Sequence, residues 1–116
     1  MSNKIAKMEQ SMIRVRMRYF GKIREMLEVK IEEYDVKEGA TLADLFLKYI
    51  PERHKKASQD WKETIFRTAK GEILLNRDGT PVLKNYLILV NGNRSSLNQK
   101  VKEGDEIAVL PPFGGG

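Results

Sequence analysis

The segment 13–19 alternates strictly between apolar and basic side chains, and this pattern constrains the fold more than any other in the chain. The apolar positions are Ile13, Val15, Met17 and Tyr19, and the basic positions between them are Arg14, Arg16 and Arg18. Successive side chains of a strand point to opposite faces of a sheet, so a period of two is typical of a strand with one buried face. The segment therefore predicts a half-buried strand whose arginines face solvent.

A second strand is predicted over residues 28–36, although its alternation is less clean. Val29, Ile31 and Glu33 are expected on one face, and Lys30 and Glu32 on the other. Gly21 ends the first strand, and residues 22–27 are compatible with a short helical turn between the two strands. The adjacent acids Glu32 and Glu33 are expected at a strand edge or turn. The chain therefore begins with two strands that form a hairpin.

The main helix is predicted after this hairpin. The Thr41 hydroxyl suits an N-cap, and Asp44, three residues later, takes the place of the usual glutamate in a capping box. Apolar side chains recur at helical spacing at Leu42, Leu45, Phe46 and Tyr49. We expect a helix over residues 41–50, and we expect Pro51 to stop it or to begin another segment.

The middle of the chain is expected to form shorter elements. Residues 52–63 are charged and compatible with a helix, and Trp61 is their expected packing point. Residues 73–75 are predicted to form a short strand. The polar run at 76–79, which ends in glycine, is a turn signal that closes this strand.

The last third of the chain returns to strands. Residues 86–90 are continuously apolar, which predicts a central strand buried on both faces. Asn91-Gly92 is expected to turn the chain, Leu97 to anchor a short crossover, and residues 106–110 to form the final strand. The predicted order is two strands, a helix, an insert and two strands, within a single domain.

Composition excludes several classes of chemistry. The 116 residues contain no cysteine, so disulfides, thiolate metal sites and cysteine nucleophiles are absent. No apolar run reaches the roughly 20 residues of a membrane helix, and the N-terminus lacks the apolar core of a signal peptide. We therefore expect a cytoplasmic protein with no membrane partner. The net charge of +5 raises nucleic acid or an acidic protein as partners. The cations are spread along the chain and mixed with acids, which argues against nucleic acid.

The sequence also lacks the apparatus of a self-sufficient enzyme. His54 is the only histidine and lies beside Lys55 and Lys56, so a solvated surface role is expected rather than a metal or general-base role. No phosphate-binding glycine motif and no serine nucleophile elbow occurs. We therefore expect neither a bound cofactor nor a metal.

The C-terminal tail, residues 111–116, is the most distinctive chemical feature. Pro111 and Pro112 favour an extended stem, Phe113 follows, and Gly114, Gly115 and Gly116 add no side-chain bulk up to the terminal carboxylate. Such a tail can enter a narrow pocket and present its carboxylate there. A carboxylate is a poor electrophile and reacts only after activation, for example as an acyl-adenylate. The proline stem restricts the tail in advance, which lowers the ordering cost of binding.

The chain resembles the small subunit of molybdopterin synthase and the related ubiquitin-like sulfur carriers. Four segments carry the resemblance in the family's order, from about residue 12 to the end. They are Ile13-Arg14-Val15-Arg16-Met17-Arg18-Tyr19-Phe20-Gly21-Lys22-Ile23-Arg24-Glu25, Thr41-Leu42-Ala43-Asp44-Leu45, Leu89-Val90-Asn91-Gly92-Asn93 and residues 104–116. The terminal run of an acidic turn, an apolar strand, Pro-Pro and final glycines is the most specific of the four.

This resemblance implies an α+β fold of the β-grasp (ubiquitin-like) class, in which a mixed sheet packs on one main helix. The domain would span residues 12–110, after a flexible leader at 1–11 and with an elaborated middle segment at about 51–84. It also implies that an activating enzyme uses ATP to adenylate Gly116, which is then converted to a thiocarboxylate. Gly115 and Gly116 carry over as the reactive tip, and Gly114 as the small residue before them. The implied partners are that enzyme and the large subunit of molybdopterin synthase.

Several readings remain open on the sequence alone. The same glycine tail serves sulfur carriers for thiamine and for tRNA thiolation, and archaeal-type modifiers that are joined to acceptor lysines. A third class is a non-catalytic β-grasp interaction module whose arginine face binds acidic protein or RNA. For the leading reading, Leu110 and Phe113 are the expected apolar anchors on the partner, within a partner-binding segment that also includes Pro111, Pro112 and Gly114.

Overall fold

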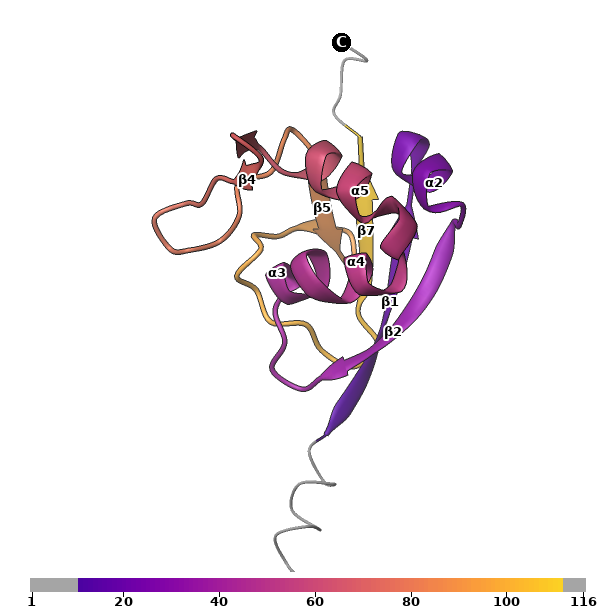
Figure 1. The fold of residues 1–116 in the computed structure, drawn as a ribbon. Helices are drawn as coiled ribbons and strands as arrows, with labels where there is room; N and C mark the ends of the chain where they lie inside the picture. Colours follow the sequence, from indigo (N-terminus) through magenta and orange to yellow (C-terminus); the bar gives the residue numbers. More distant parts are fainter. Residues whose placement is uncertain (1–10, 112–116) are drawn as a thin grey trace, which may run out of the picture.

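The computed structural model describes residues 11–111, and a five-stranded sheet forms its frame (Figure 1). The strand order across the sheet is β2-β1-β7-β5-β6. The strands are β1 (Met12–Tyr19), β2 (Ile31–Lys37), β5 (Leu87–Val90), β6 (Asn93–Arg94) and β7 (Glu106–Leu110). β1 pairs with β2 in an antiparallel manner and with β7 in parallel, so the first and last strands of the chain are neighbours at the centre of a mixed sheet.

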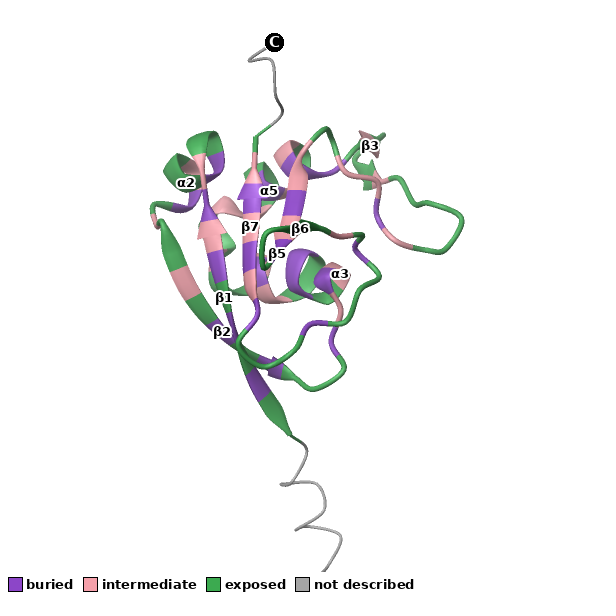
Figure 2. Ribbon diagram, turned by 180° about the vertical axis from the view of Figure 1, so that it is seen from behind, coloured by how far each residue is buried: buried purple, intermediate pink, exposed green. Residues whose placement is uncertain are grey.

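The helices cover one face of this sheet and leave the other open (Figures 1 and 2). They are α2 (Gly21–Leu27), α3 (Leu42–Asp44), η1 (Leu45–Tyr49), α4 (Ile50–Arg53), η2 (Lys55–Ala57) and α5 (Ser58–Ile65). β1 alternates as predicted: Ile13, Val15, Met17 and Tyr19 are buried on the helix side, and the arginines between them lie on the open face. The helical turn expected after Gly21 is α2. Among the described residues, no helix has the length and apolarity needed to cross a membrane.

The main helix begins with the predicted capping box. The Asp44 backbone N–H donates to the Thr41 hydroxyl at 3.2 Å, and the Thr41 backbone N–H donates to the Asp44 carboxylate at 2.9 Å. Of the two alternatives predicted for Pro51, the second holds: Pro51 does not stop the helical backbone but lies in the first turn of a new element, α4, which follows η1 directly. Proline cannot donate a helical hydrogen bond and crowds the carbonyl one turn back. The chain accommodates it through the wider π-helical turn of η1, which directly precedes α4.

The core lies between the sheet and the helices, and Trp61 of α5 is one of its largest side chains. Its indole N–H donates to the Phe46 carbonyl at 2.9 Å, and the two rings lie 5.5 Å apart. The buried apolar side chains include Val15, Met17, Tyr19, Ile88, Ile107 and Val109 from the sheet and Leu42, Leu45, Phe46, Trp61 and Ile65 from the helices. The prediction of Trp61 as the packing point is confirmed.

The strand prediction for residues 28–36 had the wrong phase. β2 begins at Ile31, which is exposed, and its buried side chains are Tyr34 and Val36. Glu28 ends α2 in the left-handed conformation, with φ at 59°. Tyr34 and Val36 set the inward phase, and this places Glu32 on the inner face as well. A charged side chain can occupy this inner position because the hydroxyls of Tyr19 and Tyr34 donate hydrogen bonds to the Glu32 carboxylate.

The prediction that residues 86–90 form a central strand buried on both faces is also wrong. β7 is the central strand, and β5 lies between β7 and the short strand β6. Only Ile88 and Val90 are buried, whereas Leu87 and Leu89 are half-exposed on the open face (Figure 2). The expected turn at Asn91-Gly92 is present, with φ of 52° and 85°. The expected burial of Leu97 is confirmed.

Residues 66–84 form a separate small structure, which we call the insert arm. Its hairpin consists of β3 (Thr68–Ala69) and β4 (Glu72–Ile73). Beyond β4, the predicted turn closes through two backbone hydrogen bonds, from the Gly79 N–H to the Asn76 carbonyl and from the Asn76 N–H to the Thr80 carbonyl. The strand predicted at residues 73–75 is shorter than expected, because β4 ends at Ile73.

Candidate functional site

The end of the sheet from which the C-terminal tail departs is the candidate site. β7 ends at Leu110, which pairs with Leu87 of β5, while Val109 pairs with Tyr19 of β1. Pro111 follows and is exposed. The predicted site residues Leu110 and Pro111 therefore lie where the chain leaves the sheet. The others, Pro112, Phe113, Gly114, Gly115 and Gly116, lie outside the described residues.

Gly21 lies beside Pro111, the first residue after β7, which we call the tail root. A Cβ atom added to Gly21 would lie 3.5 Å from Pro111 Cγ, so the proline ring already rests close to the glycine backbone. Gly21 also has φ at 58°, in the left-handed region that favours glycine. The sequence pattern identified this residue only as the end of a strand, and its contact with Pro111 was missed. The contact joins residues far apart in the chain, so no local signal reveals it.

An apolar patch lies on the open sheet face next to the tail root. It consists of four half-exposed side chains, Leu87, Leu89, Ala108 and Leu110. Leu87 is paired with Leu110 and Leu89 with Ala108, so the four side chains form one contiguous surface across β5 and β7. We call it the apolar sheet patch.

The arginines of β1 lie on the same open face, over its other half. Arg14 Nε is 2.9 Å from the Asp35 carboxylate, Arg16 Nη2 is 3.2 Å from Glu33, and Arg18 Nε is 3.0 Å from Glu106. The hydrogen bond from Arg14 holds the pKa of Asp35 below its ordinary value. Each arginine is therefore paired with an acid on a neighbouring strand.

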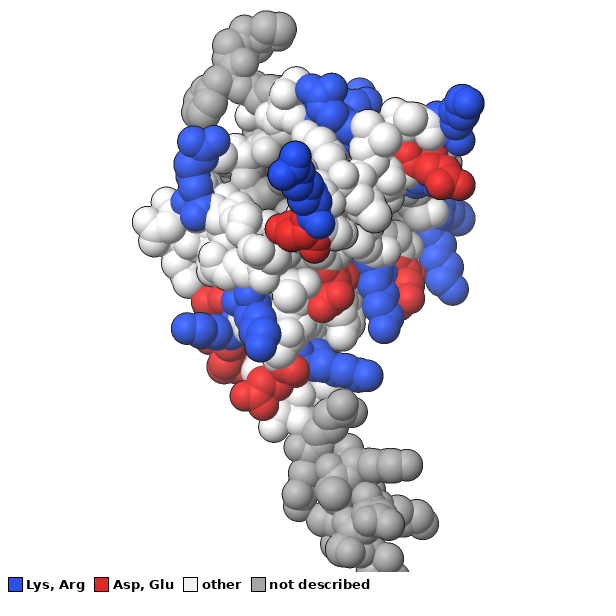
Figure 3. Space-filling model, turned by 90° about the vertical axis from the view of Figure 1, so that its left-hand side faces the viewer, with Lys and Arg blue, Asp and Glu red and all other residues white. Residues whose placement is uncertain are grey.

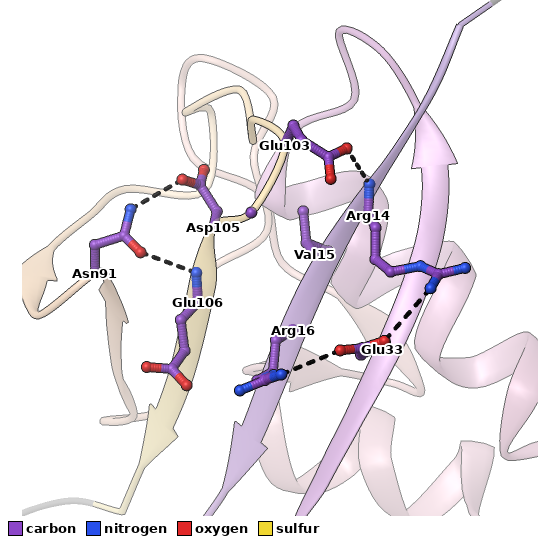
Figure 4. Close-up of a pocket in the computed structure, with 9 residues that line it drawn as sticks. Arg14, Val15, Arg16, Glu33, Asn91, Glu103, Asp105 and Glu106 are labelled. Carbon is purple, nitrogen blue, oxygen red and sulfur yellow. Dashed lines mark hydrogen bonds and ion pairs between the residues drawn. The ribbon is translucent and has the colours of Figure 1, made fainter.

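A shallow groove of about 490 Å³ lies among these ion pairs, at the far end of β7 from the tail (Figure 4). The Arg14 backbone N–H donates to Glu103 at 2.9 Å, and the Asn91 side chain bridges Asp105 and the Glu106 backbone, also at 2.9 Å. The charged side chains that line the groove thus all contact other residues of this chain. The groove is an internally paired network and leaves no charge free for a ligand.

His54 does not have the solvated surface role that the sequence predicted. Its side chain is only 18% exposed, and Nε2 lies 2.9 Å from the Glu32 carboxylate. Glu32 also accepts hydrogen bonds from the hydroxyls of Tyr19 and Tyr34, both at 2.7 Å. The sequence neighbours of His54 are exposed lysines, and the glutamate that pairs with it is 22 residues earlier. This distance in sequence explains the error.

The pKa values in this cluster follow from burial and hydrogen bonding. Burial alone raises the pKa of Glu32, but the hydrogen bonds from Tyr19, Tyr34 and His54 together outweigh it and leave the pKa below its ordinary value. Burial raises the pKa of Tyr19 and of Tyr34, so both phenols stay protonated and continue to donate. Hydrogen bonds from Tyr19, Tyr34 and His54 thus stabilise the ionised carboxylate of Glu32.

Arg53 closes the outer edge of β2 beside this cluster. Its Nη1 donates to the Glu33 carbonyl at 2.7 Å and lies 3.5 Å from the Glu32 carboxylate. Its guanidinium also lies 3.8 Å from the centre of the Tyr34 ring. Within residues 11–111, no group of three or more potential ligands is arranged to hold a metal ion. The cluster fastens α4 and His54 to the sheet edge.

Comparisons with known proteins agree with this geometry. The model of the ThiS family matches residues 17–116. No curated protein matches the chain. Among solved structures, a putative molybdopterin converting factor, subunit 1, from Pyrococcus furiosus is 31% identical, with a TM-score of 0.62, over 87% of this chain and 99% of that one.

Two further solved structures share the fold at lower identity. SAMP1 from Haloferax volcanii is 23% identical, with a TM-score of 0.64, over 89% of this chain and 99% of that one. The small archaeal modifier protein 1 from Methanosarcina acetivorans is also 23% identical, with a TM-score of 0.66, over 91% and 99% of the two chains. The α+β, β-grasp fold and the resemblance inferred from the sequence are confirmed. The chain belongs to the ThiS family, and its fold is the ubiquitin-like β-grasp.

Proposed function

We propose that this protein is a sulfur carrier that donates sulfur from its C-terminal Gly116 as the small subunit of a molybdopterin-synthase-like complex. The observation that carries the proposal is the origin of the tail. The tail directly continues β7, the central strand of the sheet, and it leaves the sheet where Pro111 lies beside Gly21 and Leu110 pairs with Leu87. A tail with a rigid root presents its carboxylate at a defined place on a partner.

The proposed chemistry takes place at the tip of the tail. The Gly116 carboxylate attacks the α-phosphate of ATP on an activating enzyme, which gives an acyl-adenylate and releases pyrophosphate. A sulfide-level sulfur nucleophile then displaces AMP and leaves a thiocarboxylate, which returns to a carboxylate when the sulfur is passed on. Gly115 and Gly116 lack side chains, so the attacking groups meet no steric hindrance. The carrier itself needs neither a bound cofactor nor a metal for these steps, because ATP is used on the enzyme.

The apolar sheet patch is the surface that we expect to dock on the partner. It adjoins the tail root, so a partner that takes the tail into a channel also covers Leu87 and Leu110. Large apolar side chains near the centre of an interface contribute most of its binding energy. We propose Leu110 and Phe113 as the anchors, with Pro111, Pro112 and Gly114 as the segment that lines the channel.

The assignment to molybdopterin synthesis is supported by the Pro-Pro stem and by the relative at 31% identity, which is described as a putative molybdopterin converting factor subunit. The partners are then the activating enzyme and the large subunit, which receives the thiocarboxylate. Thiamine synthesis and tRNA thiolation use the same tail chemistry and remain as alternative destinations of the sulfur.

The proposal is tested by the intact mass of the protein from its native host, followed by sequencing of the C-terminal peptide. We expect a mass change equal to the exchange of one oxygen for sulfur, located at Gly116. Deleting Gly116, or adding one residue after it, should abolish sulfur transfer while leaving the far-ultraviolet circular dichroism spectrum unchanged. Full sulfur transfer by either variant would contradict the proposal.

The second candidate function is protein modification, in which an acceptor lysine amine attacks the activated Gly116. It is favoured by the two small archaeal modifier proteins, which share this fold across nearly their whole length. Covalent ladders on a denaturing gel of host extract, absent when Gly116 is deleted, would identify this function. A terminus that stays unmodified after incubation with ATP, a sulfur donor and host extract would instead favour a non-catalytic binding module.

A further inference from the structure

The insert arm joins the sheet at the same end from which the tail departs. Its last residues lead directly into β5, whose first residue, Leu87, pairs with Leu110 at the end of β7. The front and rear views agree, because the hairpin of β3 and β4 lies beside the tail end of the sheet in both (Figures 1 and 2). A protein that holds the tail is therefore close to the arm.

The arm is held firmly to the domain. At the end of the arm, the Lys84 N–H donates to the Ile65 carbonyl and the Lys84 ammonium donates to the Glu63 carbonyl, both at 2.8 Å, which ties the arm to α5. Within the arm, the Arg67 N–H donates to the Val82 carbonyl at 2.9 Å. Phe66 at the base of the arm is buried in the core. A surface that is already ordered loses little conformational entropy on binding.

Two adjacent leucines of the arm are exposed. Leu74 is 42% exposed and Leu75 is 62% exposed, which places both among the most exposed large apolar side chains of residues 11–111. They lie just beyond β4, before the turn at residues 76–79. Single exposed leucines are ordinary on protein surfaces, but two consecutive ones give the arm exposed apolar surface next to its cations.

The arm also carries cations that have no acidic partner. They are Arg67, Lys70, Arg77 and Lys84, all exposed, and none of them forms an ion pair within the described part of the chain. The acids of the arm are Glu72 and Asp78, and the Asp78 carboxylate accepts hydrogen bonds from the Thr80 N–H and hydroxyl. Figure 3 shows the side of the molecule that carries the arm, where Lys and Arg side chains project into solvent. The arm therefore carries four cations against two acids, and none of the four is in an ion pair within residues 11–111.

We propose that the insert arm docks on an acidic surface of the enzyme that activates the tail, with apolar contacts from Leu74 and Leu75. This inference rests on the proposed function, but it holds whether the activated tail then carries sulfur or modifies lysines, because both uses begin with activation. The leucines favour a protein over a nucleic acid as the occupant. A phosphate backbone would bind the cations but would leave both leucines in water.

The experiment measures ATP–pyrophosphate exchange by the purified activating enzyme of the host as a function of the concentration of the full-length chain. One variant carries Leu74→Ser with Leu75→Ser, and another carries Arg67→Glu with Arg77→Glu. For each we expect the KM for the chain to rise about ten-fold, which corresponds to about 1.4 kcal/mol, with kcat unchanged. Added salt should raise the KM of the wild-type chain and have little effect on that of the charge variant.

Matched controls lie outside the arm. Leu47→Ser with Met12→Ser removes apolar side chains of similar exposure, 43% and 55%. Lys100→Glu with Lys102→Glu makes the same change in net charge with two exposed lysines near the other end of β7. Both controls should keep the wild-type KM. Because every substituted side chain is exposed, thermal melting should confirm that all four variants fold.

The outcomes separate this inference from the proposed function. Wild-type exchange, with a KM that neither arm variant changes, would overturn the role of the arm and leave the carrier function intact. No exchange with the wild-type chain would overturn both. Binding of single-stranded RNA with steep salt dependence, lost in the charge variant while the enzyme KM is unchanged, would replace the protein partner with a nucleic acid.

Discussion

The arginines of β1 and the cations of the insert arm are both exposed, yet they differ in what surrounds them. On β1, each arginine faces an acid on the adjacent strand β2 or β7, at 2.9 to 3.2 Å. On the arm, none of the four cations has an ion-pair partner within residues 11–111. The structure therefore gives less support to binding of an acidic partner by the arginine face than to binding by the arm, whose cations form no ion pairs within residues 11–111.

The difference shows that the location of net charge cannot be judged from clusters of one sign in a sequence. Arg14, Arg16 and Arg18 form the densest alternating basic set, but strand pairing brings Glu33, Asp35 and Glu106 beside them. In the arm, the paired strands β3 and β4 place Thr68 opposite Ile73 and Ala69 opposite Glu72, so strand pairing brings no acid opposite an arm cation. Four variants test this contrast between the paired arginines of the sheet and the unpaired cations of the arm, each through the free energy of unfolding.

The largest loss of stability is expected from a substitution in the core, to which both Trp61 of α5 and Phe66 at the base of the arm belong. Trp61→Ala should lower the free energy of unfolding by about 3–5 kcal/mol, because it leaves a cavity and removes the hydrogen bond to the Phe46 carbonyl. Urea denaturation measures the loss, with fluorescence of Tyr and circular dichroism as separate probes. A loss below about 1 kcal/mol would show that the helices next to the arm do not unfold together with the sheet.

The next effect concerns the carboxylate that fastens His54 to the sheet edge. The pKa of Glu32 lies below its ordinary value of 4.5, so its stabilising contribution is fully present above that pH and is lost as pH falls through the lower pKa of the folded state. Glu32→Gln should cost about 1–3 kcal/mol at neutral pH and make the loss of stability on acidification shallower. Glu25→Gln is the control, because Glu25 is exposed on α2 and forms no ion pair within residues 11–111, and it should leave the free energy of unfolding at neutral pH unchanged.

A smaller effect is expected from the paired arginines. Arg18→Ala removes the contact with Glu106 at 3.0 Å, and it should change the free energy of unfolding by less than about 1 kcal/mol, with a smaller change at high salt. Denaturation at low and high salt gives both values. A loss comparable to that of Trp61→Ala would mean that the ion pairs of the sheet face contribute to the fold rather than to its surface charge.

The smallest effect is expected from the cations of the arm. Arg67→Ala with Arg77→Ala should leave the free energy of unfolding unchanged, because both side chains are exposed and neither forms an ion pair within residues 11–111. The same denaturation series measures it. Destabilisation equal to that of Arg18→Ala would contradict the contrast between the two basic regions.

Local patterns in the sequence were sufficient where the deciding contacts are local. The alternation of β1, the capping box at Thr41 and Asp44, and the turn at Asn91-Gly92 each depend on residues a few positions apart. The final strand and its continuation into the tail were also predicted, because the apolar run at 106–110 is bounded by a turn and by prolines.

The errors arose where distant residues decide. Tyr34 and Val36 set the phase of β2, and the inward position of Glu32 is satisfied by hydrogen bonds to Tyr19 and His54, which are distant in sequence. β5 appeared central because all of its residues are apolar, but Leu87 and Leu89 belong to the open patch beside the tail. Of the predicted site residues, Leu110 and Pro111 are located, and the roles of Gly115 and Gly116 remain predictions.

The central position of β7 has a mechanical consequence for a protein that is handled by its tail. β7 is hydrogen-bonded to β1 on one side and to β5 on the other. A pull on the tail runs along the strand, so it loads both rows of hydrogen bonds together in shear instead of opening them one at a time. In the proposed function, this arrangement lets a partner release the tail from its channel repeatedly without unfolding the domain.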